Sequence, residues 1–332
     1  MPRRFVHRIG VLLLSILVLT IGVWCSLALW FRCGVGNPAL IGSAMFALTL
    51  FTAGCLWTAW RWRVLMIYAA PVIVVVIWWS MIEPTNDRDW APDVARTITG
   101  TINGDRLTVE NVRNFVWHGP SDFEPHWEQR TYDLSKLKDV DLVMSYWAGE
   151  AIAHTIVSFG FEGGSRLAFS IEIRRERDEA YSTLAGFFKQ YDLVLIAADE
   201  RDVVKVRSNV RGEDVRIFRL GMAPANARRL LQEYIAEAND IALHPRFYNT
   251  LTSNCTTLVF QMARAVHPAL PLDPRILISG YLPNYVYDIG ATNTHMPFNE
   301  LRQRSRIQQK ALQAGDDEAF SARIREGVPL PR

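Results

Sequence analysis

The first 82 residues contain no aspartate, no glutamate and no lysine. Their charge comes from six arginines, which are Arg3, Arg4, Arg8, Arg32, Arg61 and Arg63. All 34 acidic residues follow them, together with the other 30 of the 36 basic ones, so the net charge of +2 hides a balance of −4 in residues 83–332. That balance excludes a basic nucleic-acid-binding domain as the first interpretation. The hydrophobic fraction of 49% excludes a disordered or collagen-like chain.

Other absences narrow the chemistry of the chain. The sequence has no glycine-rich phosphate loop, no internal repeat and no low-complexity tract. Its seven histidines and four cysteines lack the spacing of metal ligands. We therefore expect no metal and no cofactor.

Three runs lack Asp, Glu, Lys, Arg and His altogether: Ile9–Phe31, Cys33–Trp60 and Val64–Ile82. Each run reaches the length of about 20 residues that a helix needs to cross a bilayer. The first is too long in its apolar core for a cleaved signal peptide, and further runs follow it. We expect residues 1–82 to form a three-helix transmembrane region, with a buried helical core of a soluble protein as the alternative.

The arginines predict the orientation of these spans. Arg3, Arg4 and Arg8 precede the first run, and Arg61 and Arg63 lie between the second and third. Because positive charge is retained on the cytoplasmic side, the N-terminus is expected in the cytoplasm. Three crossings then place everything after residue 82 outside a bacterial inner membrane, in the periplasm. The protein is thus expected to be integral to the membrane and to bind no nucleic acid.

The sequence pattern of residues 83–296 predicts an α+β domain with an antiparallel sheet. Two strands, Ala153–Phe161 and Arg166–Arg174, flank the turn Glu162-Gly163-Gly164-Ser165 and form a hairpin pattern. Helices are expected over Pro224–Leu243 and from about Cys255 to Val266, the second capped by Ser253 or Asn254. The other expected strands are Val94–Ile102, Arg106–Trp117, Asp139–Trp147, Leu193–Ala197, Val203–Arg207 and Val215–Leu220. Residues 297–332 are expected to be a charged tail, with a surface helix followed by disorder.

Cys255 is the only cysteine of the expected periplasmic domain, since Cys25 and Cys55 lie in spans and Cys33 lies in the short outer loop. In an oxidising compartment a single thiol is buried, bridged or used, and a disulfide to Cys33 is one alternative. At the start of a helix, free amides and the helix dipole favour a thiolate and can stabilise an oxyanion. A small residue packed under a helix is the other interpretation.

A thiolate nucleophile needs a base. His154 opens a strand of apolar and small residues, where an imidazole needs a partner, whereas the other periplasmic histidines lie in loops or beside prolines. On the next strand Ser170, Glu172 and Arg174 share one face. Glu172 is therefore the candidate that orients the His154 ring, although a solvated strand edge gives the same pattern. Candidates for an oxyanion hole or substrate contact are Asn254, Tyr248 and Arg174.

The order of a histidine strand, a hairpin and an Asn-Cys helix resembles the permuted papain-like fold of lecithin:retinol acyltransferase and related thiol enzymes. Residues 85–290 more closely resemble the Lnb N-terminal periplasmic domain family, and residues 247–255 (FYNTLTSNC) are the most specific part. The other segments that carry this resemblance are residues 86–90, 111–115, 154–161 and 170–174. The resemblance implies N-acylation of lipoproteins, with Cys255 as nucleophile, His154 as base and Glu172 as a less certain orienting group. The three preceding membrane helices depart from the longer architecture of the Lnb proteins.

These observations lead to one principal hypothesis and two alternatives. The principal one is an inner-membrane thiol acyltransferase that acts at the periplasmic face through a Cys255 thioester, with a phospholipid as acyl donor and a lipoprotein as acceptor. The first alternative is a periplasmic cysteine amidase or peptidase acting on cell-wall peptides or proteins. The second is a non-enzymatic, membrane-anchored binding module.

Overall fold

The computed structural model describes residues 2–34 and 36–331, with only the backbone of Pro2 and Arg3, so the side chain of Arg3 used in the orientation argument lies outside the described part. The chain forms two compact units. The first comprises residues 1–85 and 181–190, and the second comprises residues 86–180 and 191–332. The boundary lies close to the expected one, but the loop 181–190 belongs to the first unit.

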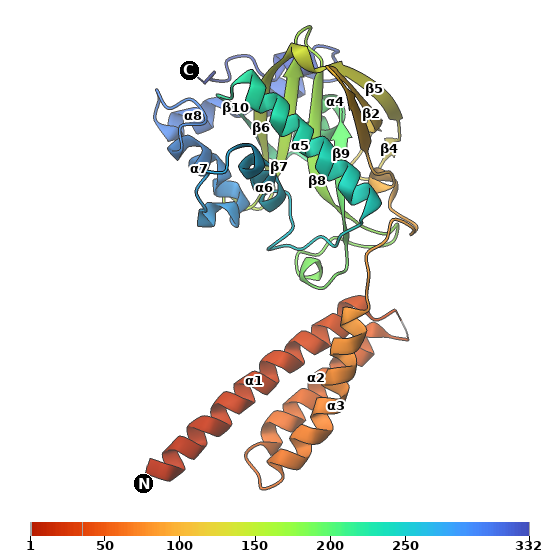
Figure 1. The fold of residues 1–332 in the computed structure, drawn as a ribbon, viewed down its shortest axis with the longest axis vertical. Coiled ribbons are helices and arrows are strands. Elements are labelled where there is room, and N and C mark those ends of the chain that lie inside the picture. The colour runs from red at the N-terminus through yellow and green to blue at the C-terminus, as the bar shows by residue number, and fades with distance from the viewer. Residues whose placement is uncertain (1, 35, 332) are drawn as a thin grey trace. The chain divides into compact units, whose positions relative to one another are not determined.

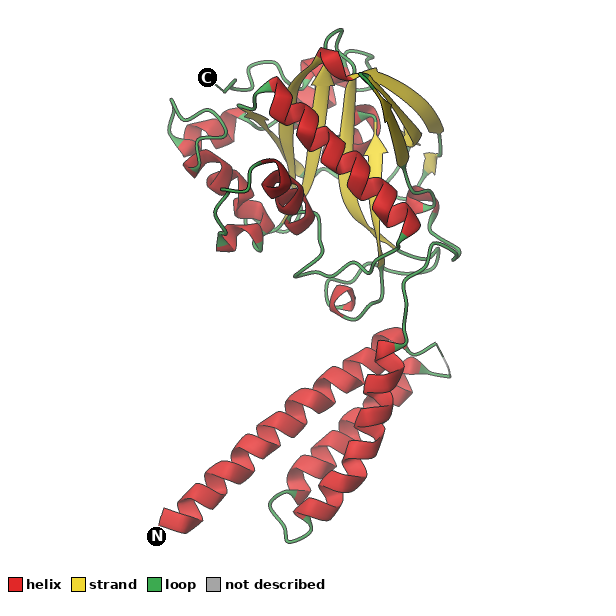
Figure 2. Cartoon of the chain, in the orientation of Figure 1, coloured by secondary structure: helices red, strands yellow, loops and turns green. Residues whose placement is uncertain are grey.

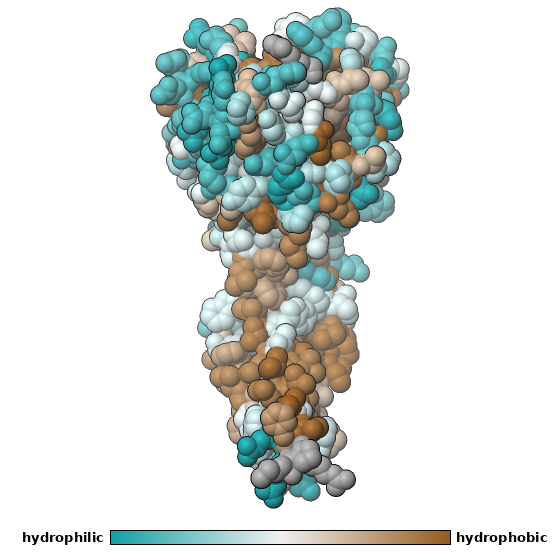
Figure 3. Space-filling view, turned by 90° about the vertical axis from the view of Figure 1, so that its left-hand side faces the viewer, coloured by the Kyte–Doolittle hydropathy of each residue, from teal (hydrophilic) through white to brown (hydrophobic). Residues whose placement is uncertain are grey.

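The first unit contains the three expected spans, each long and apolar enough to cross a membrane. They are α1 (Pro2–Arg32), α2 (Pro38–Cys55) and α3 (Arg61–Ser80). Small residues let α1 and α2 approach closely, because a Cβ atom on Gly42 would lie 2.8 Å from the Ser26 carbonyl oxygen. The hydroxyls of Thr49 and Tyr68 then join α2 to α3 at 3.0 Å. Hydrophobic residues cover the spans on the face drawn in Figure 3.

The second unit is built on one large sheet (Figures 1 and 2). The strand order is β1-β2-β9-β8-β7-β6-β10, with β5 paired to β2. Every pair is antiparallel except β2 with β9. The strands of this sheet are β1 (Thr99–Asn103), β2 (Arg106–Arg113), β5 (Trp127–Asp133), β6 (Leu137–Tyr146), β7 (Ala153–Phe161), β8 (Arg166–Arg174), β9 (Asp192–Ala198) and β10 (Asp214–Leu220). A separate pair consists of β3 (Val116–Trp117) and β4 (Phe123–Glu124).

Helices cover both faces of the sheet, and a separate core lies on each. The long helix α5 (Pro224–Leu243) crosses one face (Figure 1), where Tyr234 packs between Phe159 and Phe169. The same core receives α6 (Thr257–Val266) and α7 (Leu282–Asp288). The opposite face carries α4 (Glu200–Val203), α9 (Gln308–Ala314) and α10 (Phe320–Arg323), while α8 (Phe298–Arg304) buries Leu301 in the first core. The expected class, three apolar helices followed by an α+β domain with a mostly antiparallel sheet, is confirmed.

Two local expectations are wrong. Residues 203–207 are not a strand, because Asp199 caps α4 by accepting the Arg201 amide, and a π-helix, η4 (Val206–Val210), follows. The valines that suggested a strand are buried in this helical segment. The expected disorder after residue 297 is also absent from the described residues. Phe320, Ile324 and Val328 are buried in the core on the second face, so this charged segment is an integral layer of the domain.

Candidate active site

His154 and Glu172 meet where two strands separate. Pairing between β7 and β8 runs from Gly160–Arg166 to Ile156–Ser170 and ends there. His154 lies two residues before Ile156, and Glu172 lies two residues after Ser170, so both side chains project from the same face. The Nε2 atom of His154 lies 2.6 Å from Ser170 Oγ and 3.2 Å from Glu172 Oε1.

Ser170 links the ring to the carboxylate. Its hydroxyl donates to Glu172 Oε1 at 2.7 Å, so it accepts the Nε2 proton of His154. Nε2 of His154 is thereby occupied, and Nδ1 is the ring nitrogen left for the thiol of Cys255. The structure thus brings the expected histidine and carboxylate together and adds a serine, which the strand-face pattern had already grouped with Glu172.

Asn254 fixes the turn that presents Cys255. Its Oδ1 accepts the backbone amides of Thr256 at 2.9 Å and Thr257 at 3.0 Å, and its Nδ2 donates to the Thr250 carbonyl at 2.8 Å. Asn254 therefore holds the turn that leads into α6, and both of its side-chain atoms are used within the chain rather than aimed at a substrate oxygen. Of the backbone amides around the thiol, that of Cys255 has no hydrogen-bond partner within the described residues, which makes it the donor available to an oxyanion.

Cys255 is a buried, free thiol, so within residues 2–34 and 36–331 no disulfide joins it to Cys33. Its sulfur lies 3.9 Å from Thr256 Oγ1, and it is close enough to the His154 ring and the Thr155 backbone for both to lower the pKa of the thiol. Thr155 lies just beyond the last residue that pairs with β8. The separation of β7 and β8 therefore leaves the backbone group that holds the sulfur beside the imidazole.

The charges of the site support an ion pair between the thiol and the imidazole. Burial raises the pKa of the Cys255 thiol, but the His154 charge and hydrogen bond outweigh it, and the net pKa is lowered. Burial and the Arg207 charge lower the pKa of His154, yet Glu172 and Cys255 raise it to about 9. Burial likewise opposes ionisation of Glu172, but His154 and Arg207 hold its pKa well below the usual range. Both pKa shifts favour a thiolate beside an imidazolium, and that pair would supply a nucleophile with its acid in place.

Arg207 is a residue of this site that the sequence interpretation missed. It lies in the π-helix η4, with 8% of its side chain exposed, and its Nη2 donates to Glu172 Oε1 at 2.8 Å. Its Nη1 lies 3.5 Å from Glu213 Oε2, and Glu213 in turn accepts the Ser145 hydroxyl. π-Helices are rare and often occur at functional sites. A lone arginine in a valine-rich run was the available signal, and the strand assignment concealed it.

The structure gives two other candidates packing roles. Tyr248 packs against the core of the domain, and its backbone amide donates to the Tyr191 carbonyl at 3.0 Å. Arg174 is 3% exposed, and its guanidinium donates to backbone or side-chain oxygens of Val94, Ala95 and Asn86 and lies 4.4 Å from the Trp90 ring centre. Arg174 therefore fixes residues 86–95 to the sheet instead of facing a substrate.

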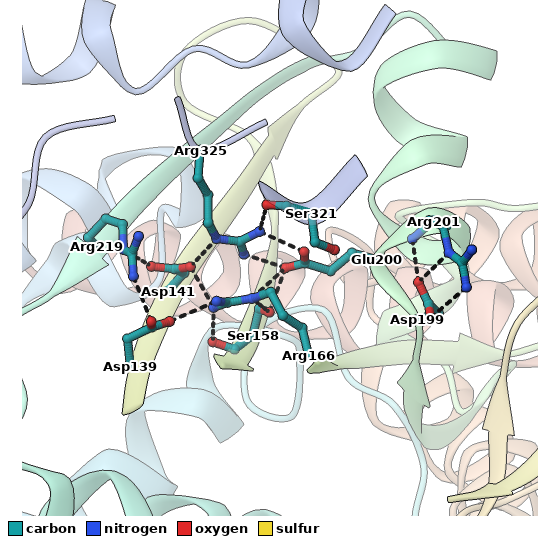
Figure 4. A network of polar contacts seen from close by, with 10 residues as sticks. All are labelled: Asp139, Asp141, Ser158, Arg166, Asp199, Glu200, Arg201, Arg219, Ser321 and Arg325. Carbon is teal, nitrogen blue, oxygen red and sulfur yellow. Dashed lines mark hydrogen bonds and ion pairs between the residues drawn. The ribbon is translucent and has the colours of Figure 1, made fainter. Parts of the chain in front are cut away.

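A polar cavity of about 610 Å³ lies apart from the thiol. Among its lining residues are Arg130, Arg166 and Arg201, and none belongs to the Cys255–His154 site. Arg166 and Arg201 are drawn in Figure 4 with their carboxylate partners. In the described part of the chain, no group of three or more His, Cys, Asp or Glu side chains is arranged to hold a metal ion.

Comparison with known proteins connects this geometry to a family. The model of the Lnb N-terminal periplasmic domain matches residues 123–280, which include His154, Glu172, Arg207 and Cys255. No curated protein and no solved structure matches the chain. The matched domain follows three helices able to span a membrane. The protein is therefore a membrane protein in which residues 123–280 match the model of the Lnb N-terminal periplasmic domain.

Proposed function

We propose that this protein is a thiol acyltransferase of the periplasmic membrane face, with Cys255 as nucleophile, His154 as acid and base, and Glu172 as the group that orients and charges the ring. One observation carries the proposal: a buried thiol lies beside an imidazole that lowers its pKa, and the Nε2 atom of that ring is held by Ser170 and Glu172. A cysteine that merely fills a core has no need of such a chain of polar groups. We also propose that the domain is a permuted papain-like fold, since the histidine strand β7 precedes the cysteine helix α6.

The reaction follows from the ion pair. The Cys255 thiolate attacks the carbonyl carbon of an acyl ester, and the C–S bond forms as the bond to the alcohol oxygen breaks. The departing oxygen takes the proton of the His154 imidazolium. In the second half an amine attacks the thioester, its proton passes to His154, and the thiolate leaves. The free amide of Cys255 is placed to stabilise the oxyanion in both steps.

The proposed substrates are a membrane phospholipid as donor and the N-terminal amine of a lipoprotein as acceptor. Two features support this choice: the chain is anchored in the lipid that would supply the acyl group, and its domain matches the model of a family implicated in lipoprotein N-acylation. We propose that the N-terminus is cytoplasmic, because Arg4, Arg8, Arg61 and Arg63 would then lie on the cytoplasmic side.

The test is acyl transfer from labelled phospholipid by the full chain in detergent or vesicles. Intact-mass and peptide analysis should find the acyl group on Cys255 in a hydroxylamine-sensitive bond. Cys255→Ala and His154→Ala should each lower transfer by about 10³-fold or more while the protein stays folded and inserted. Cys55→Ala, in the span α2, is the matched control and should retain activity.

The same experiment separates the alternatives. Release of the acyl group to water with no transfer to an amine, or cleavage of a peptide with no lipid thioester, identifies a hydrolase. Absence of any adduct on Cys255 together with full activity of Cys255→Ala would overturn the assignment.

A further inference from the structure

Residues 181–190, which connect β8 to β9, pack against the ends of the membrane spans. The ring of Phe188 stacks on Phe31 of α1 at 5.6 Å, and it meets the edge of Trp79 of α3 at 6.4 Å. The ammonium of Lys189 donates to the carbonyl oxygens of Trp79 at 2.9 Å and Ile82 at 3.1 Å. Both spans present their C-terminal ends to this loop, so the loop lies at one bilayer surface.

Lys189 is held in place as an anchor. Its backbone adopts the left-handed conformation with φ of 51°, which is uncommon for a residue other than glycine. The ammonium binds carbonyls at and just beyond the C-terminal end of α3, where the helix dipole favours a cation. It also lies 5.1 Å from the centre of the Trp79 ring. Several independent contacts therefore converge on one side chain.

The outer side of the loop is apolar. Leu184 is 48% exposed and Phe187 is 41% exposed, whereas Ala185 and Gly186 between them are buried. Residues 185–187 form a 3₁₀ turn, in which positions three apart lie above one another, so Leu184 and Phe187 share one side. Residues 181–190 contain no acidic side chain.

We propose that residues 181–190, the interfacial loop, insert Leu184 and Phe187 into the phospholipid leaflet at the C-terminal ends of α1 and α3. The occupant of this apolar surface is lipid, because the loop is continuous with spans that are themselves surrounded by lipid. Apolar side chains placed at the boundary of headgroups and acyl chains bind the bilayer in proportion to the area that they bury. The inference is independent of acyl transfer.

The experiment places p-benzoylphenylalanine at Leu184 or Phe187 of the full chain. The protein is reconstituted in vesicles of radiolabelled phosphatidylethanolamine and phosphatidylglycerol and irradiated. Ile73, 55% exposed on α3, is the positive control, and Leu312, 56% exposed on α9, is the matched control outside the loop. Lipid adducts from positions 184 and 187 should approach those from position 73 and exceed those from position 312 by at least about tenfold.

The proposal would be overturned if lipid labelled positions 184 and 187 no more strongly than position 312. Adducts with a second protein chain in place of lipid would also overturn it. The measurement is repeated with Cys255→Ala, which should label equally well. Failure of the acyltransferase proposal therefore leaves this result unaffected, and failure of lipid labelling leaves the chemistry of Cys255 unaffected.

Discussion

Glu172 is the residue on which the charges of the site converge. Its Oε1 lies within 3.2 Å of His154 Nε2, accepts the Ser170 hydroxyl and accepts an Arg207 N–H. Three partners keep this carboxylate ionised despite its burial, and the ionised carboxylate in turn favours the imidazolium. Glu172 therefore acts through His154, as a positioning residue.

The first prediction concerns the pH dependence of Cys255. The ion pair is populated between the lowered pKa of the Cys255 thiol and the His154 pKa of about 9. Above the pKa of His154 the imidazolium loses its proton, and below the pKa of Cys255 the thiolate is protonated. Glu172→Gln removes the charge that raises the His154 pKa, so the basic limb should move to lower pH. The rates of acyl transfer and of Cys255 alkylation, measured from pH 5 to 10, check this shift.

Glu176→Gln is the control for this prediction, since Glu176 is a half-exposed carboxylate paired with Arg88. Its pH profile should match that of the unaltered protein. An unchanged basic limb in Glu172→Gln would show that the carboxylate does not govern the ring.

At the scale of elements, the start of α6 sets the position of the thiol. Asn254→Ala removes the acceptor for two amides and should cost about 1 kcal/mol of stability. The freed turn should also let the thiol pKa rise toward its ordinary value. Thermal unfolding of the full chain in detergent and the alkylation rate at pH 7 measure the two effects.

Asn254→Asp keeps the accepting oxygen and should restore most of the stability. The prediction is wrong if the alanine and aspartate variants lose the same stability.

The C-terminal segment is fixed to the sheet by a buried charge network (Figure 4). Arg325 donates to Asp141 and Glu200, whose side chains are fully buried, and Arg166 contacts the same two carboxylates. Burial opposes ionisation of Glu200, but the arginines lower its pKa to about 2. The stability that ionised Glu200 contributes to the fold is therefore complete above its unfolded-state pKa of about 4.3. It is lost as the pH falls through the folded-state pKa of about 2.

Arg325→Met leaves two buried carboxylates short of a partner and should destabilise the full chain by about 3–5 kcal/mol at pH 7. The loss should shrink as the pH falls below about 4, because Glu200 then takes up a proton in the variant. Denaturant unfolding at pH 7 and at about pH 3 measures both effects. Arg323→Met, whose side chain is 49% exposed, is the control and should change stability by less than about 1 kcal/mol. Equal losses in the two variants would contradict the role of the network.

At the scale of the whole molecule, the arginine distribution predicts the topology. Alkaline phosphatase fused after residue 332 should be active, because it would lie in the periplasm. The same enzyme fused at Thr58, between α2 and α3, should be inactive. A fluorescent protein that folds only in the cytoplasm should give the opposite pattern at the two positions. Activity of the phosphatase at Thr58 would contradict the proposed orientation.

Elements with strong local patterns were predicted closely. The hairpin β7–β8 and the helix α5 have the expected bounds, because alternation and helical periodicity are read from neighbouring residues. Residues 203–207 were misassigned, because a valine-rich run is ambiguous and the Asp199 cap decided for helix. Burial of the charged segment after residue 297 also escaped prediction, since it depends on arginines and carboxylates that lie far apart in the chain.

By itself the sequence determined the three spans, the α+β class and the single thiol beyond the membrane. Each of these depends on composition or on short-range periodicity. The tertiary structure decided which groups surround that thiol. His154 and Cys255 are separated by about a hundred residues, and the fold brings Arg207 of η4 to Glu172 of β8 across 34 intervening residues. These side-chain contacts depend on the separation of β7 from β8 and on helical packing, and no pattern of neighbouring residues predicts them.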